Sequence, residues 1–79
     1  METILKKELI ERGLLLIDLL ALTKCVESKG QGRRIIVQSS VFVNGIKETD
    51  IGRELDINDM INNSISIQIG TKVIRVVFE

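Results

Sequence analysis

A chain of 79 residues, 44% of them hydrophobic, is long enough for one domain with a modest core, and its two phenylalanines as sole aromatic residues make that core aliphatic. The absence of proline argues against disorder, and the single cysteine excludes an intramolecular disulfide, which fits a reducing compartment. With no histidine, no paired cysteines and no convincing carboxylate pair, the sequence argues against an enzyme, a cofactor and a metal site.

The formal net charge is zero, but the charges are unevenly distributed. Residues 24–53 hold six positive and three negative side chains, a net charge of +3, and the remaining residues balance it with −3. The basic side chains of this segment are Lys24, Lys29, Arg33, Arg34, Lys47 and Arg53. A segment with this bias is suited to an anionic partner.

The apolar segments are too short for a membrane protein. The longest run, residues 14–22, is interrupted by Asp18 and is far below the ~20 residues that a membrane span requires. The opening METILKKELIER contains acidic residues that do not fit the positive start of a signal peptide. We therefore expect a cytoplasmic protein with no membrane contact.

The first half of the chain predicts helices. Residues 2–12 fit either a short helix or an edge strand, and residues 14–24 predict a helix with Asp18 opposite its main apolar face. That face combines Leu16, Leu19, Leu20 and Thr23, while Leu14, Leu15 and Leu22 flank Asp18. This helix is more apolar than one core needs, so the N-terminal segment or a partner must cover it.

A second helix is predicted over residues 29–38. Ser28 is a favourable N-cap, and Gln31 completes a capping box of the S-x-x-Q type. The spacing places Gly32, Ile35 and Ile36 on the inner side, and Arg33, Arg34 and Gln38 on the side that faces water. The short connection between the helices predicts a helix-turn-helix pair.

Beyond residue 40 the apolar period changes to two. The sequence VFV-NG-IKE predicts a hairpin, because a type I′ turn needs positive φ at both central residues and Asn-Gly provides it. SISIQI at 64–69 and KVIRVVF at 72–78 predict two further strands, with Phe42 and Phe78 in the core. The expected fold class is α+β, a two-helix unit followed by a small antiparallel sheet.

The stretch LLALTKCVESKGQGRRIIVQSSVFVNG, followed by ETDIGREL and INDMI, resembles the RNA-binding domain of the ribosomal protein S-four type. Within that family it looks most similar to stand-alone small proteins of the YbcJ/YaaA type. The resemblance implies the alpha-L motif, a helix–helix–hairpin unit that holds structured RNA across its second helix. It implies one RNA-binding domain over 1–79, with the motif at about 14–61 and C-terminal strands at 64–78.

Carried over position by position, the resemblance implies nine RNA contacts. They are Lys24, Ser28, Lys29, Gln31, Arg33, Arg34 and Gln38, extended by Lys47 and Arg53 after the hairpin turn. Without tryptophan or tyrosine, and with Phe42 and Phe78 expected in the core, recognition should depend on RNA shape and backbone rather than on base stacking. The alternative interpretation of the two arginines is an ordinary solvated helix face.

Several positions depart from the family pattern. Gly32 replaces a helix-favouring alanine, at a cost of about 1 kcal/mol. Ser39 occupies the glycine position that ends the helix, where φ is positive. Ala21 stands where a lysine is common, and Asp50 and Ile51 replace a pair that is often basic. The lost positive charges should weaken binding.

Other residues are expected to be structural. Cys25 is expected to be a buried or half-buried structural residue rather than a nucleophile, because no histidine exists to activate it. The sequence GQG lacks the frame of a nucleotide-binding loop. Asp18 and Asp59 should be helix-surface and turn residues rather than an acid–base pair.

The sequence thus predicts a small non-catalytic protein that binds structured RNA, either ribosomal RNA, a ribosome-assembly intermediate or tRNA-like RNA. The alternative is a protein-interaction module or homodimer formed through the leucine-rich first helix, with RNA binding lost.

Overall fold

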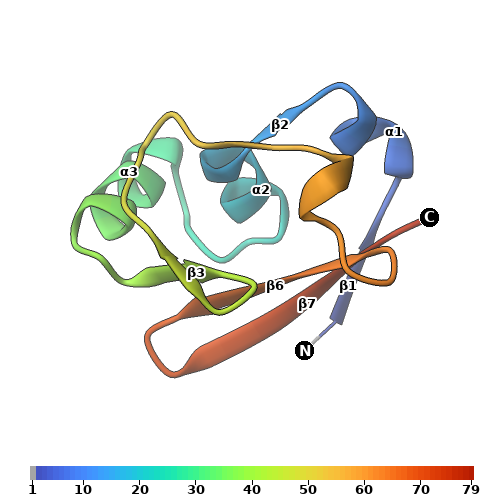
Figure 1. Cartoon of the computed structure of the whole chain (residues 1–79). Coiled ribbons are helices and arrows are strands. Elements are labelled where there is room, and N and C mark those ends of the chain that lie inside the picture. The colour runs from blue at the N-terminus through green and yellow to red at the C-terminus, as the bar shows by residue number, and fades with distance from the viewer. Residues whose placement is uncertain (1) are drawn as a thin grey trace.

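The computed structural model describes residues 2–79, which form a layer of helices packed on one face of a sheet (Figure 1). The elements in chain order are β1 (Glu2–Leu5), α1 (Lys7–Glu11), β2 (Leu14–Leu15), α2 (Leu16–Leu22), α3 (Lys29–Val37), β3 (Val41–Val43), β4 (Ile46–Glu48), β5 (Glu54–Leu55), the 3₁₀ turn η1 (Ile57–Asp59), β6 (Ser64–Ile69) and β7 (Lys72–Phe78). The expected α+β class is confirmed.

The main sheet of the described residues has five strands in the order β1-β7-β6-β3-β4. Strand β1 pairs in parallel with β7, and the other neighbours are antiparallel. The prediction of a purely antiparallel sheet that follows the helices is therefore wrong at one edge. The cause is a pairing between the two ends of the chain, which aligns Thr3 with Val76 and leaves no local sequence signal.

The N-terminal segment contains both of the elements between which the sequence left the choice open. Residues 2–5 form a strand, and residues 7–11 form a short helix whose Ile10 is completely buried. The two are tied to the end of the chain by backbone hydrogen bonds, from Lys7 N–H to the Glu79 carbonyl and from Glu79 N–H to the Leu5 carbonyl, at 2.8 and 2.9 Å. The segment therefore joins the sheet to the helical layer.

The first predicted helix is shorter than residues 14–24. Leu14 and Leu15 form an extended pair with β5, and α2 begins only at Leu16. Its apolar face is confirmed, because Leu16, Leu19 and Leu20 are completely buried. The helix ends before Lys24, which adopts a φ of 60°.

Helix α3 begins at Lys29 after the N-cap Ser28, as predicted. The Ser28 hydroxyl accepts a hydrogen bond from the Gln31 N–H at 3.1 Å, as an N-cap should. The reciprocal half of the box is shifted by one residue, since the Gln31 side chain accepts the N–H of Glu27 at 2.7 Å. At the other end, Ser39 has a φ of 61° and completes a Schellman motif together with the Ser40 N–H, which donates to the Ile35 carbonyl.

The C-terminal strands follow the sequence prediction closely. Asn44 and Gly45 have φ values of 51° and 82°, as a type I′ hairpin turn requires, and β6 and β7 occupy the expected residues. Phe78 is 2% exposed and confirms its place in the core. The expectation for Phe42 is wrong: it alternates with the buried Val41 and Val43, so it lies half-buried on the opposite face of the sheet.

The core lies between the helices and the sheet. It is aliphatic apart from Phe78 and contains Ile10, Leu14, Leu16, Ile17, Leu19, Leu20, Val26, Ile36, Val41, Val43, Leu55, Ile65, Ile67, Ile74 and Val76. Cys25 is a half-buried free cysteine packed against this core. No helix within residues 2–79 has the length and apolar character to cross a membrane.

Candidate nucleic-acid interface

Helix α3 directs two arginines into solvent. Its inner side is set by Ile36, which is completely buried, and by Gly32, which is buried and faces Ile17 of α2. At about 100° per residue, Arg34 then points almost directly outward and Arg33 lies beside it, and both are exposed. Neither guanidinium has a carboxylate partner within the part of the chain that the structure describes. Their positive charges are therefore directed to solvent without neutralisation.

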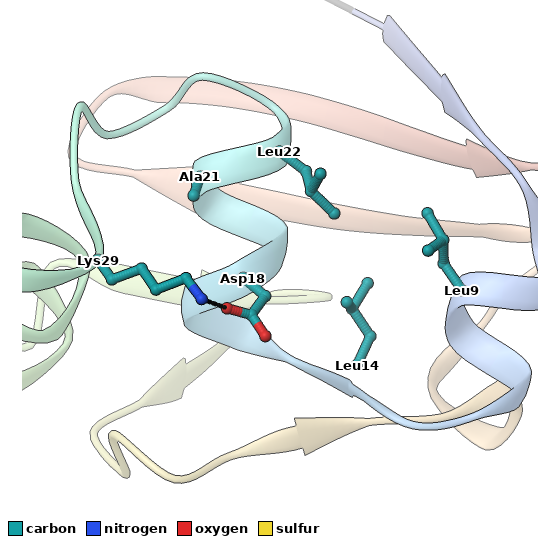
Figure 2. A pocket seen from close by; sticks show the side chains of 6 residues that line it. All are labelled: Leu9, Leu14, Asp18, Ala21, Leu22 and Lys29. Carbon is teal, nitrogen blue, oxygen red and sulfur yellow. Dashed lines mark ion pairs between the residues drawn. The ribbon is translucent and has the colours of Figure 1, made fainter.

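The N-terminal turn of α3 adds one cation, which is partly neutralised. Lys29 Nζ lies 3.0 Å from Asp18 Oδ1 on α2 (Figure 2). That oxygen is shielded from water and accepts no hydrogen bond from residues 2–79, so the pair is a charge contact without hydrogen-bond geometry. The Lys29 side chain remains 61% exposed. It can therefore serve an anion only in competition with Asp18.

Four further predicted contacts surround the two arginines. Lys24 is exposed in the turn before α3, and Gln38 is exposed at its C-terminal end. Ser28 and Gln31 are engaged in the N-cap described above, so their side chains hold the helix start in place. The structure thus brings seven of the nine predicted residues onto α3 or the turns at its two ends.

Lys47 does not belong to this group. It lies on β4 opposite Phe42, on the face of the sheet away from the helices, with its Nζ 6.0 Å from the centre of the Phe42 ring. The expectation that Lys47 extends the α3 surface is therefore not supported by its position.

Arg53 is also separate, because it is held by two carboxylates. Its Nε donates to Glu48 Oε1 at 2.8 Å, its terminal nitrogens donate to Asp59, and the side chain is 30% exposed. The hydrogen bond to Asp59 raises the pKa of Arg53 above its ordinary value, although partial burial acts in the opposite direction. Burial alone would raise the pKa of Asp59, but the bonds from Arg53 and from the Asp56 N–H lower it below its ordinary value. This charge is already neutralised.

The cluster of Arg53, Glu48 and Asp59, termed here the Arg53 clamp, fixes the loop after the hairpin. Asn44 reinforces it, since its amide donates to the Asp59 carbonyl at 2.7 Å and accepts the Ser66 N–H at 2.9 Å. The clamp was not expected from the sequence, because Glu48 and Asp59 end two different elements and lie five and six residues from Arg53, a spacing that no regular element predicts. The expectation that Asp18 and Asp59 have structural roles fits their ion pairs with Lys29 and Arg53.

A groove lies beside Asp18, between α1 and α2. Its volume is about 420 Å³, and Leu9, Leu14, Ala21 and Leu22 supply its apolar lining (Figure 2). Leu9 and Leu22 are 38% and 49% exposed. The N-terminal segment therefore covers part of the excess leucine surface and leaves the rest open. Across residues 2–79, no group of three or more candidate ligands is arranged to hold a metal ion.

In comparison with known proteins, the matching family model and the relatives all refer to tyrosine–tRNA ligases. A family model described as the tyrosine–tRNA ligase SYY-like C-terminal domain matches residues 3–73. Relatives named tyrosine–tRNA ligase include those of Clostridium beijerinckii, 37% identical over 89% of this chain, and Clostridium botulinum, 40% identical over 89% of this chain. A third, from Borrelia turicatae, is 36% identical over 86% of this chain. The chain spans only 16–17% of the length of these curated relatives.

Proposed function

Because the chain belongs to the family of tyrosine–tRNA ligase SYY-like C-terminal domains, we propose that it is an RNA-binding module of the ribosomal protein S-four type. The single observation that carries the proposal is the pair of unneutralised arginines on the outer side of α3. We propose that it acts in the cytoplasm without catalysing a reaction of its own.

The physical basis is electrostatic docking. Arginine guanidinium groups can bind phosphate oxygens through two parallel hydrogen bonds, and release of condensed counterions drives the association. Lys24 and Lys29 lie near the N-terminal end of the same helix, where the helix dipole also favours an anion. Since the core anchors α3 through Ile36, the helix backbone is already ordered before RNA binds, and only the side chains lose freedom on binding.

The proposed target is folded RNA rather than a short sequence motif. The α3 surface has charged and amide side chains but no aromatic one, which favours recognition of RNA shape and backbone. The relatives are named tyrosine–tRNA ligases, so tRNA-like RNA is the first candidate, and ribosomal RNA or a ribosome-assembly intermediate is the second. A stand-alone role of the YbcJ/YaaA kind is part of this proposal.

Charge reversal on α3 tests the proposal. In Arg33→Glu/Arg34→Glu, we expect loss of binding to a tRNA transcript in a fluorescence anisotropy titration, with an unchanged circular dichroism spectrum, because both side chains are exposed. The matched control is Lys6→Glu/Lys7→Glu, which changes the net charge equally at exposed positions at and next to the start of α1. Equal binding by the α3 variant and the parent would refute the proposal, and equal loss in both variants would show that only total charge matters.

A second function is supported by a different feature, the groove between α1 and α2. Its leucine lining and the exposure of Leu9 and Leu22 favour a protein-interaction module or a homodimer. Light scattering across a range of protein concentrations discriminates between the two functions. A rise in mass that Leu22→Lys abolishes, without binding of any RNA by the parent, would favour this second function.

A further inference from the structure

The outer face of the main sheet has no covering layer within residues 2–79. The helices α1, α2 and α3 lie on the other side of the sheet (Figure 1), and strand register assigns alternate residues to the open face. Those residues are Glu2, Ile4, Phe42, Lys47, Ser64, Ser66, Gln68, Val73, Arg75 and Val77. This set contains one aromatic ring, two cations and one acid.

One row across four strands concentrates the aromatic and polar groups. Phe42 on β3 stands opposite Lys47 on β4 and opposite Gln68 on β6, and Gln68 stands opposite Val73 on β7. The Lys47 ammonium lies 6.0 Å from the Phe42 ring centre, within range of a cation–π contact. Val73 is 51% exposed. The row therefore presents the Phe42 ring and the Val73 side chain, with the Gln68 amide between them. Lys47 lies on the other side of the ring.

A shallow hollow adjoins this row and supplies further polar groups. It has a volume of about 440 Å³, and its lining consists of Asn44, Ile61, Asn62, Ser64, Ser66, Val73 and Arg75. Val73 belongs to both the row and the hollow. The Arg75 guanidinium donates to the Ser64 hydroxyl at 3.3 Å and has a weak contact of 3.5 Å with exposed Glu2. Weakly paired and exposed, it is available to an anion.

These groups match the chemistry of an unpaired nucleic-acid strand. Bases stack on aromatic rings irrespective of sequence, and cations beside the ring bind the phosphates that follow. Lys47 stands at one end of the row, and Arg75 lines the hollow. These two cations outnumber the single acid, Glu2, so the face has a net positive charge that complements a polyanion. A protein partner would instead favour a continuous apolar surface, which the row of alternating polar residues interrupts.

We propose that the outer face of the sheet is a second RNA contact, which takes an unpaired segment by stacking a base on Phe42 and holding a neighbouring phosphate with Arg75. The choice of RNA as the occupant rests on the proposed function of the chain. The two surfaces lie on different faces of the molecule, so α3 would hold the folded part of an RNA and the sheet would hold a single-stranded part that flanks it.

The absence of tryptophan allows a direct test. Phe42→Trp places one fluorophore in the row, and single-stranded oligouridylate should quench its emission by stacking, whereas a blunt hairpin RNA should not. The matched control is Ile46→Trp, which lies in the same hairpin, is 73% exposed in the parent and belongs to the opposite side of the sheet register. Its emission should not respond to oligouridylate.

Affinity measurements supply the second readout. Phe42→Leu, which keeps an apolar side chain, should weaken oligouridylate binding about fivefold or more, the lower end of a base-stacking contribution. The same substitution should leave the affinity for the blunt hairpin unchanged. Arg75→Gln should weaken oligouridylate binding while hairpin binding persists.

The outcomes separate this inference from the proposed function. Hairpin binding by the parent, combined with no quenching in Phe42→Trp and no effect of Phe42→Leu, would overturn the inference alone. Quenching without any binding of folded RNA would support the inference and refute the proposed α3 function. If the emission of the Phe42→Trp variant changes with protein concentration in the absence of RNA, the inference is overturned, since a second copy would then occupy the face.

Discussion

At the scale of single residues, the account depends on which side chains are neutralised. Arg33 and Arg34 have no carboxylate partner within residues 2–79, Lys29 shares its charge with Asp18, and Arg53 is fully engaged by the clamp. Counting basic residues along the chain therefore overstates the surface available to RNA. The same reasoning ranks the expected effects of substitution. The loss of RNA affinity should be large at Arg33 and Arg34 and smaller at Lys29, whereas substitution of Arg53 should lower stability rather than affinity.

Gly32 offers a test of how α3 packs. A β-carbon at this position would meet Val26 Cγ2 at 3.6 Å and Ile17 Cγ2 at 3.7 Å, which are ordinary contact distances. Gly32→Ala should therefore raise the free energy of unfolding by up to about 1 kcal/mol, because it removes the backbone entropy cost of glycine inside a helix. Urea denaturation monitored by circular dichroism measures the change.

The matched control for that substitution is Gly30→Ala, in the exposed first turn of the same helix. It should have a smaller effect, because the cost of glycine is that of a helix interior rather than of a first turn. A β-carbon there would also meet only the Ser28 hydroxyl, at 3.8 Å, and would add no contact with the core. A loss of stability in Gly32→Ala would contradict the packing distance between α3 and α2 that directs the arginines outward.

At the scale of elements, the Arg53 clamp holds the segment from β4 to η1 against the hairpin. Asp59 has a pKa below its ordinary value of 3.8, so its ionised form stabilises the folded state above that pH. As the pH falls from about 3.8 toward the lower folded pKa, that contribution must disappear. The clamp is therefore a source of acid sensitivity.

Asp59→Asn tests this linkage. We expect the free energy of unfolding at neutral pH to fall by about 1.5–3 kcal/mol, the range for hydrogen bonds to charged groups, and the further decrease below the ordinary carboxyl pKa to become shallower. Urea denaturation at several pH values from neutral to acid measures both effects. The control is Glu11→Gln, an exposed carboxylate on α1. An acid-side decrease as steep in Asp59→Asn as in the parent would refute the role of the clamp.

The elements that the sequence predicted are those with local signals. Helix α3 has its cap at Ser28, the hairpin has Asn44 and Gly45 at its turn, and β6 and β7 alternate with period two. The parallel pairing of β1 with β7, the β2–β5 pair and the Arg53 clamp join residues through space, so periodicity and capping do not reveal them. The outward position of Phe42 did have a signal, its alternation with Val41 and Val43, which the aromatic character of the residue obscured.

The candidate site was predictable to the same extent. The side of α3 that carries Arg33 and Arg34 follows from the spacing of Gly32, Ile35 and Ile36, and the structure has the predicted arrangement. The face of Lys47 was predictable, because the predicted two-residue hairpin turn places it opposite Phe42, but the expectation of Phe42 in the core hid this. The position of Arg53 was not predictable, because it depends on a partner on η1, Asp59. The assignment of all nine residues as RNA contacts remains a prediction.

At the scale of the whole molecule, the net charge of zero conceals two surfaces of different character. The α3 side presents concentrated positive charge, and the open side of the sheet presents an aromatic row between cations. Because the cations of both surfaces are exposed and would displace counterions from phosphates, RNA binding should be sensitive to ionic strength. This sensitivity distinguishes electrostatic docking from an apolar contact through the groove between α1 and α2.

The salt dependence of affinity for a tRNA transcript tests the central claim most directly. With about four phosphate contacts, the logarithm of the association constant should fall with the logarithm of salt concentration with a slope of about −3. In Arg33→Gln/Arg34→Gln the loss of about two contacts should reduce the slope to about −1.5. A parent slope near zero, or the same slope in the parent and the double variant, would contradict the claim that these two guanidinium groups hold the RNA backbone.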